Sequence, residues 1–151
     1  MGKFLLLFFT FLAGFILSAL FFAPMAIGER EVYAPGNHLG PDRIQVFEDR
    51  VILDVPDVVW ASFKDTGSMK PFFDHGAHAL QYRPRVSSDI SVGDIVTFEN
   101  DQGIIVVHRV VHKGSDAQGI YFITQGDNNR VSDPGRLRFD DIRTVLFAII
   151  Y

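Results

Sequence analysis

The residues with the clearest chemical potential begin with a serine in a tight turn. Ser68 lies within the heptapeptide DTGSMKP at 65–71, where Gly67 permits a sharp change of backbone direction and Pro71 restricts how the chain leaves the turn. A serine just after such a turn can present its Oγ free of its own backbone. Serine is a poor nucleophile at pH 7 and needs an adjacent base. Taken alone, the box predicts no more than a turn serine.

A histidine further along the chain supplies a candidate base. The run 104–112 (IIVVHRVVH) is typical of a strand, so residues 104, 106, 108, 110 and 112 are expected on one face. His108 would then lie between Val106 and Val110, where an imidazole is commonly a core histidine. A near-neutral pKa and a rigid mount are also what a general base needs. His112, at the end of the run, is expected to be solvated.

Two carboxylates follow in the polar segment 126–134 (GDNNRVSDP). Either Asp127 or Asp133 could accept a hydrogen bond from the Nδ1–H of an imidazole and so orient it. The segment could equally be a polar loop that fixes its own turns through Asp and Asn side chains. A serine, a histidine and an acid in one small domain together indicate acyl transfer, in which the oxyanion also needs donors.

The elements that must position these residues are short strands. Apolar runs rich in β-branched and aromatic residues alternate with turn signals, and no sustained helical period follows residue 27. The pattern predicts a mainly β domain of sandwich or barrel type. Residues 33–42, rich in Pro and Gly, are expected to be a linker or loop. The expected strands are 50–55, 58–63, 78–82, 95–98, 104–111, 120–124 and 145–151.

The N-terminal segment predicts a membrane anchor. No charged residue occurs from 4 to 27, a span long enough as a helix to cross a hydrocarbon core of about 30 Å. Lys3 and the free amine favour the N-terminus inside. We therefore expect a cytoplasmic N-terminus at 1–3, a transmembrane anchor at 4–27, a linker or start of the ectodomain at 28–49 and an extracytoplasmic catalytic β domain at 50–151. A cleaved signal peptide is the alternative, although the apolar run is long for one.

Composition excludes several classes of function. The 151 residues carry a formal net charge of -4 and no long basic run, so nothing indicates nucleic-acid binding. The absence of cysteine excludes disulfides, thiolate catalysis and Cys-ligated zinc. The hydrophobic fraction of 48% is high for a soluble domain and agrees with one membrane-embedded segment.

Four boxes give the chain a resemblance to a known family. TGSMKP at 66–71 resembles the Ser-Gly-Ser-Met-x-Pro box of type I signal peptidases, and VGDIVTF at 92–98 resembles their Gly-Asp-Ile-Val box. His108-Arg109-Val110 falls where bacterial members have a lysine and the archaeal and endoplasmic-reticulum branch has histidine. GDNN at 126–129 with Asp133 is similar to that branch's last box. Thr66 replaces the usual serine, and Ala77 stands where the family usually has an aspartate.

The resemblance implies roles for individual residues. Ser68 would be the nucleophile of a serine endopeptidase and His108 its general base, with Asp133 and Asp127 as the acidic members. The resemblance favours Asp133 as the group that orients His108. The main-chain N–H of Ser68 and the Thr66 hydroxyl would form the oxyanion hole. No metal or other cofactor is implied.

The resemblance also implies a setting. The substrates would be secretory precursor proteins, cut at their signal peptides after small residues at positions −3 and −1. The enzyme would be single-pass in the cell membrane, or in the endoplasmic-reticulum membrane of a eukaryote, with its catalytic domain on the outer face. Its partners would be those precursors and the lipid bilayer, with no nucleic acid. Accessory subunits are not indicated by the sequence.

Other interpretations remain open. The chain could process a single exported precursor, or it could be a non-catalytic membrane-tethered domain that binds peptides. A metal-binding module is a further alternative, because His75 and His78, His108 and His112, and Asp74 have suitable chemistry, although no His-Glu-x-x-His helix is present. Phe72 and Phe73 follow the serine box directly and would either pack in the core or form an apolar surface on the membrane.

Overall fold

The regular structure is almost entirely β. The computed structural model describes residues 32–151, and Val32–Tyr151 forms one unit of its own. The predicted anchor at 4–27 and the cytoplasmic stretch at 1–3 lie outside the described residues. Within 32–151, no helix has the length and apolar character needed to span a membrane. The prediction of a mainly β fold is confirmed for this part of the chain.

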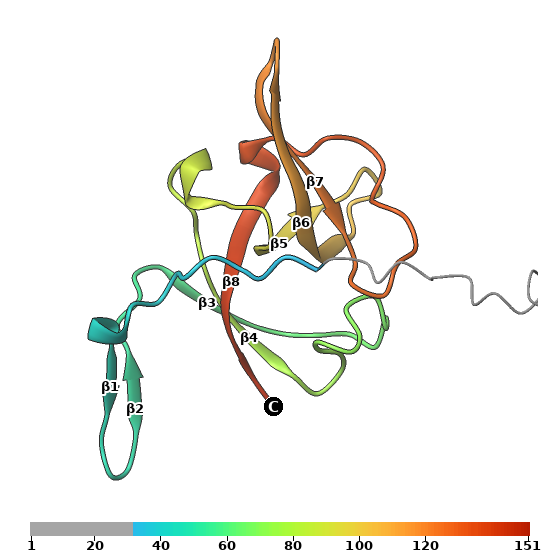
Figure 1. Cartoon of the computed structure of the whole chain (residues 1–151). Helices are drawn as coiled ribbons and strands as arrows, with labels where there is room; N and C mark the ends of the chain where they lie inside the picture. Colours follow the sequence, from blue (N-terminus) through green and yellow to red (C-terminus); the bar gives the residue numbers. More distant parts are fainter. Residues whose placement is uncertain (1–31) are drawn as a thin grey trace, which may run out of the picture. The chain divides into compact units, whose positions relative to one another are not determined.

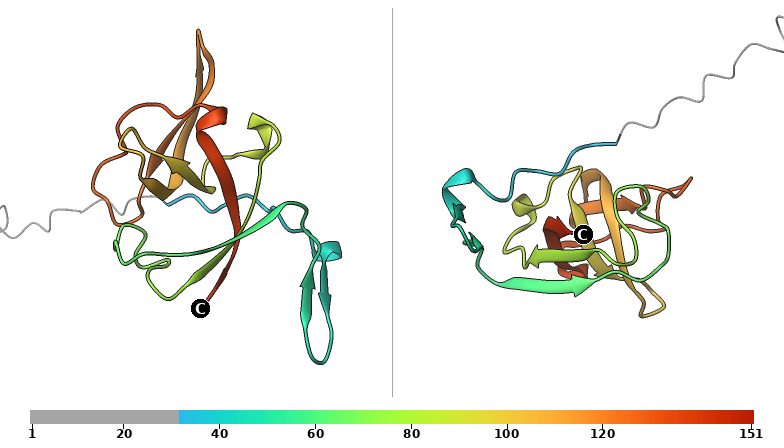
Figure 2. Two further views of the ribbon diagram at one scale, coloured as in Figure 1. Left: turned by 180° about the vertical axis from the view of Figure 1, so that it is seen from behind. Right: turned by 90° about the horizontal axis from the view of Figure 1, so that it is seen from below.

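Six strands form a single antiparallel sheet in the order β3-β4-β8-β5-β6-β7 (Figure 1). A separate two-stranded hairpin, β1-β2, extends away from this sheet (Figures 1 and 2). Three 3₁₀ helices complete the regular elements of residues 32–151. Their bounds are η1 Pro41–Arg43, β1 Ile44–Val46, β2 Val51–Leu53, β3 Val58–Ser62, β4 His78–Tyr82, η2 Ser87–Asp89, β5 Ile95–Glu99, β6 Ile105–Asp116, β7 Gly119–Gln125, η3 Phe139–Asp141 and β8 Ile142–Ile150.

Irregularities in strand pairing bend the sheet. The register shifts between Leu80 and Gln81 of β4, between Thr97 and Phe98 of β5, and between Val110 and His112 of β6. Extra residues of this kind kink a strand and increase its twist. Sequence left a sandwich and a barrel open. Within the described residues, the six strands of the larger sheet form one bent sheet whose edge strands, β3 and β7, are not paired with each other.

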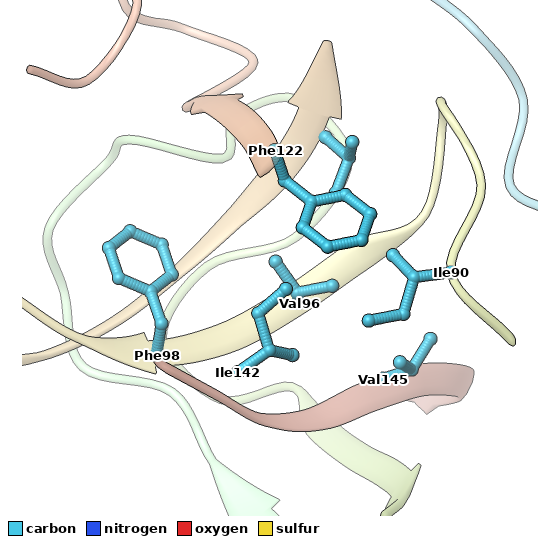
Figure 3. Close-up of a cluster of buried hydrophobic side chains, with 7 residues drawn as sticks. Ile90, Val96, Phe98, Phe122, Ile142 and Val145 are labelled. Carbon is cyan, nitrogen blue, oxygen red and sulfur yellow. The ribbon is translucent and has the colours of Figure 1, made fainter. Parts of the chain in front are cut away.

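The bent sheet encloses two apolar clusters. One lies where β5, β6, β7 and β8 meet and surrounds the ring of Phe122, which is fully buried (Figure 3). The second lies beneath the serine box and contains Met69 and Phe73. The first cluster consists of Ile90, Val96, Phe98, Val110, Phe122, Ile142 and Val145, and the second of Met69, Phe73, Ala77, Ala79, Ile95 and Leu146.

The strand that carries His108 differs from its prediction. β6 continues to Asp116, so the expected end of this strand at residue 111 is wrong, and the hairpin turns at 117–118. The expectation that His112 shares a face with His108 is also wrong, because the bulge after Val110 reverses the alternation of side chains. Lys113, not His112, turns toward the core: its ammonium lies 5.5 Å from the centre of the Phe122 ring. His112 is exposed, as expected.

The segment before the first expected strand is more ordered than a linker. β1 was not predicted, because its three residues are all exposed and carry no burial pattern. Residues 33–38 form no regular element, yet they lie beside the sheet (Figure 1) and hydrogen bond to it through Tyr33, Gly36 and His38.

The buried ring of Phe122 gives a test of the core. Phe122→Ala is expected to lower the free energy of unfolding by about 3–5 kcal/mol, because the cavity left in a packed cluster cannot fully collapse. Phe47→Ala is the matched control, since Phe47 is 46% exposed and its loss should cost no more than about 0.5 kcal/mol. Denaturant unfolding followed by far-ultraviolet circular dichroism measures both. Equal losses in the two variants would contradict this description of the core.

Candidate active site

Ser68 lies in a turn whose backbone is fixed from several sides. Gly67 has a φ of 68°, in the left-handed region that glycine adopts without strain, and its N–H donates to Asp74 Oδ1 at 3.3 Å. Ser68 Oγ lies 3.3 Å from Thr66 Oγ1. Met69, the next residue, is buried in the second apolar cluster. The turn is therefore anchored by its neighbours, and the serine hydroxyl is not part of that anchoring.

Asp74 closes the serine turn with a second contact. Its Oδ2 accepts a hydrogen bond from Lys70 Nζ at 2.6 Å. That bond, supported by the Gly67 N–H and opposed by desolvation, lowers the pKa of Asp74 to about 2. The carboxylate is therefore charged across the neutral range. Lys70 is committed to this pair and is not available as a base for Ser68.

His108 is held by an aspartate and a threonine. The imidazole side chain is 9% exposed, and its Nδ1 lies 2.7 Å from Asp133 Oδ2. Thr124 Oγ1 donates to the same carboxylate oxygen at 2.7 Å, and the Asp133 N–H donates to the Thr124 carbonyl. A carboxylate facing Nδ1 places the proton of the neutral ring on Nδ1, so Nε2 carries the lone pair. Within residues 32–151, Nε2 has no hydrogen-bond partner.

The second carboxylate has a different partner. Asp127 forms a bidentate pair with Arg109, with Nε to Oδ1 at 2.8 Å and Nη2 to Oδ2 at 2.7 Å. The side chains are only 4% and 6% exposed. Arg109 Nη1 also donates to the carbonyls of Gly93 and Tyr33. Of the two aspartates left open by the sequence, Asp133 contacts the imidazole and Asp127 holds the next residue of the strand.

The loop after β7 brings the serine turn to β6. Arg109 of β6 pairs with Gln125 of β7, so continuing this register by one residue places Gly126 level with His108. A Cβ at Gly126 would lie 2.7 Å from the Ser68 carbonyl oxygen, an approach that requires glycine. Asn128 then donates twice, from its N–H to the Ser68 carbonyl at 2.8 Å and from Nδ2 to the Gly67 carbonyl at 3.0 Å.

Packing beneath the loop joins the same two regions. Met69, next to Ser68, belongs to the cluster against which Val107, next to His108, packs. The nucleophile candidate and the base candidate are thus flanked by residues of one apolar cluster and by one polar loop. The structure brings Ser68, Thr66, His108 and Asp133 into this region.

The two phenylalanines after the serine box separate. Phe73 is 4% exposed and stacks on Phe63 within the second cluster, so it packs in the core. Phe72 is 42% exposed, and the Arg109 guanidinium lies 5.2 Å from the centre of its ring. Neither core packing nor an exposed apolar surface, the two interpretations offered for Phe72 and Phe73, therefore holds for both residues.

The histidines of the metal alternative do not come together. Within residues 32–151, no three side chains of His, Cys, Asp or Glu are grouped so that they could hold a metal ion. His78 instead stacks on Trp60, with ring centres 5.3 Å apart. The spacing of the histidines along the sequence does not translate into a ligand cluster.

Sequence reasoning missed three residues of this site. Thr124 was expected only as a strand residue, Arg109 only as part of a motif, and Asn128 only as part of a loop. Nothing in the local sequence signals that Thr124 shares a carboxylate oxygen with His108. Gly126 and the asparagines at 128 and 129 indicated a structured turn. They did not indicate that the turn would bind the carbonyls of Gly67 and Ser68.

Comparison with known proteins adds relatives to this geometry. Signal peptidase I W of Bacillus subtilis (strain 168) is 31% identical over 78 residues, which are 52% of this chain and 41% of that protein. Two fungal proteins, each called signal peptidase complex catalytic subunit SEC11, also match. The one from Colletotrichum graminicola is 36% identical over 69 residues, 45% of this chain and 40% of its own. The one from Chaetomium globosum is 33% identical over 84 residues, 55% of this chain and 48% of its own.

Over about half of its length, the chain is similar to a signal peptidase I and to signal peptidase complex catalytic subunits. No model of a known protein family matches it. The match spans less than half the length of each of these three relatives. The relatives include a bacterial signal peptidase I and proteins named as catalytic subunits of a signal peptidase complex.

The two carboxylates, Asp127 and Asp133, should differ in their structural effect. Asp127→Asn leaves the buried Arg109 guanidinium without its anionic partner and is expected to cost about 3–5 kcal/mol of unfolding free energy. Asp133→Asn removes the charge that strengthens the hydrogen bonds from His108 Nδ1 and Thr124 Oγ1 at a half-buried position, and should cost about 1–2 kcal/mol. Urea unfolding of both variants measures the difference. A larger loss for Asp133→Asn would contradict the assignment of Asp127 to the buried pair.

The Asp74 carboxylate predicts a dependence of stability on pH. Its folded pKa of about 2 is below the ordinary value of 3.8, so the charged form stabilises the fold above pH 4, and this contribution disappears as pH falls to 2. Asp74→Asn should therefore have a lower Tm than the wild type at pH 7, and the difference should vanish near pH 2. Asp101→Asn, at an exposed turn, should show no such change. A difference that persists at pH 2 would refute the role of the charge.

Proposed function

We propose that the chain is a membrane-bound serine endopeptidase that cleaves signal peptides from exported precursors through an acyl-enzyme. The observation that carries this proposal is the arrangement of His108. Its Nδ1 is bound to Asp133, and its Nε2 has no partner within residues 32–151. The loop after β7 donates hydrogen bonds from Asn128 to the carbonyls of Gly67 and Ser68. Acyl transfer by a serine requires an imidazole base that is held in one orientation, with its second ring nitrogen available to accept the serine proton.

In the proposed reaction, Ser68 Oγ attacks the carbonyl carbon of the scissile peptide bond while its proton passes to His108 Nε2. Asp133 keeps the other ring proton on Nδ1 and stabilises the imidazolium that forms. The imidazolium then protonates the leaving amine, and the C–N bond breaks to leave an ester on Ser68. Water, deprotonated by the same imidazole, attacks this ester, releases the carboxylic acid and restores the serine.

Donors for the tetrahedral oxyanion are available beside the nucleophile. We assign them to the main-chain N–H of Ser68, which has no hydrogen-bond acceptor within residues 32–151, and to the Thr66 hydroxyl. The Thr66 assignment is supported by its Oγ1, which lies 3.3 Å from Ser68 Oγ. Such donors act where charge develops, and losing one typically costs 10²–10³ in turnover.

The substrate and setting rest on the relatives and on the N-terminal sequence. Matches to a signal peptidase I and to signal peptidase complex catalytic subunits support secretory precursors as substrates. The uncharged run at 4–27 supports a single N-terminal anchor, with the N-terminus inside and the catalytic domain on the outer face of the cell membrane, or in the endoplasmic-reticulum membrane of a eukaryote. Accessory subunits remain compatible with this proposal, since some of the relatives are named as subunits of a complex.

Removal of the Ser68 hydroxyl is the direct test. The full chain is reconstituted in liposomes with a precursor that carries an Ala-x-Ala site, and cleavage by the wild type is compared with that by Ser68→Ala. Loss of the nucleophile from a Ser/His site typically costs on the order of 10⁶ in turnover. The product is identified by mass spectrometry, which locates the bond that is cut.

The control is Ser115→Ala, at an exposed serine on the distal part of β6, which should cleave like the wild type. Cleavage that survives in Ser68→Ala would overturn the assignment of the nucleophile. If the wild type binds the precursor without cutting it, the non-catalytic alternative replaces the proposal. Cleavage restricted to one precursor among many would favour a dedicated processing enzyme.

A further inference from the structure

The segment at 33–38, here called the strap, crosses the sheet beside the proposed catalytic site. The carbonyl oxygen of Ala34 lies so close to Gly93 that a Cβ there would come within 2.0 Å of it. Gly93 also has a φ of 103°. Both the close approach of Ala34 and the positive φ therefore require glycine at position 93. The Tyr33 carbonyl accepts a hydrogen bond from Arg109 Nη1 at 3.1 Å. The backbone of the strap thus contacts Gly93, which precedes β5, and accepts a hydrogen bond from the Arg109 side chain of β6.

A fully buried carboxylate fastens the strap. Asp94 is 0% exposed, and its oxygens accept three hydrogen bonds of 2.7 Å each, from the Ser91 N–H, the Gly36 N–H and His38 Nε2. Burial alone would raise the pKa of Asp94, but the hydrogen bonds from His38, Ser91 and Gly36 outweigh it and lower the pKa. Two of the three donors belong to the strap. Without the strap, a buried charge would lose most of its compensation.

His38 is itself oriented by a second contact. Its Nδ1 lies 3.1 Å from the Tyr82 hydroxyl, which also donates to the Asp89 carbonyl at 3.2 Å. The imidazole therefore bridges the end of β4 and the residue before β5. Asp94 in turn is bound to β6, because the Val110 N–H donates to its carbonyl at 2.8 Å.

The contacts of the strap lead to the nucleophile turn. Arg109 binds the Tyr33 carbonyl and, on its other side, both oxygens of Asp127. Asp127 precedes Asn128, which binds the carbonyls of Gly67 and Ser68. Resting on the proposed function, we propose that the strap is a positioning element of the active site, and that His38 is a positioning residue that acts through Asp94 and Arg109 on the placement of Ser68.

The test compares three variants of the full chain in detergent. His38→Ala removes the donor to Asp94, His38→Gln supplies an amide N–H at a similar reach, and His112→Ala removes an exposed histidine on the far part of β6. Cleavage of a peptide substrate gives kcat and KM separately. Hydrogen exchange followed by NMR reports the Asn128 amide, which donates to Ser68, and the Phe122 amide, which donates to the Leu137 carbonyl in the core.

His38→Ala is expected to lower kcat by about tenfold or more with KM changed less than about twofold, because small misplacements of a nucleophile are costly. The Asn128 amide should exchange faster while the Phe122 amide stays protected. His38→Gln should restore both readouts, and His112→Ala should match the wild type. Unchanged kcat in folded His38→Ala, or a loss that only tracks the fraction of folded protein, would overturn the proposal.

Failure of the proposed function is recognised separately. If the wild type cleaves nothing, the peptidase assignment fails, and the exchange experiment alone decides whether the strap is coupled to the serine turn. Faster exchange at Asn128 with Phe122 still protected supports that coupling. Equal exchange in wild type and His38→Ala removes it.

Discussion

The site depends on one buried ion pair, that between Arg109 and Asp127. A guanidinium presents its donors in a fixed plane, so a bidentate carboxylate on one side sets where its remaining donors point. In this protein those donors meet the carbonyls of Gly93 and Tyr33. One side chain therefore joins the end of β7, the residues before β5 and the strap. A buried pair of this kind adds little net stability compared with apolar residues, but breaking it is costly, because it leaves a charge without compensation.

Adjacent positions on β6 divide the work between chemistry and structure. His108 and Arg109 point to opposite faces of the strand, and each meets its own aspartate from the same polar loop. Asp133 Oδ2 binds His108 Nδ1 and also accepts a hydrogen bond from Thr124 Oγ1. Asp133 contacts no other nitrogen of the ring, so His108 Nε2 stays available. Asp127 binds the Arg109 guanidinium through both of its carboxylate oxygens. A single loop can thus orient a base and lock the strand that carries it, without the two carboxylates competing for one partner.

Much of this arrangement could be predicted from the sequence, and the rest could not for physical reasons. Turn residues and alternating apolar positions placed β3, β4, β5 and β7 within a residue or two, because burial dictates their pattern. The bulge after Val110 has no such pattern in the sequence. The predicted length of β6 and the predicted orientation of His112 were therefore wrong. The choice between Asp127 and Asp133 depends on distances across strands, which spacing along the chain does not encode. His38 lies among Pro and Gly residues that indicate only a loop, although its partner Asp94 is fully buried.

The serine turn is held by its backbone, and this explains how its side chain can stay available. Asn128 binds two carbonyls, Asp74 binds the Gly67 N–H, and Met69 anchors the turn in the apolar cluster. None of these contacts uses the Ser68 hydroxyl, so the conformation of the turn does not depend on the group proposed to react. Burial in the same cluster accounts for Ala77, which stands where the signal peptidases that the chain resembles usually have an aspartate. Ala77 is 2% exposed in that cluster, so a carboxylate there would need its own buried partner, whereas a methyl group packs without one.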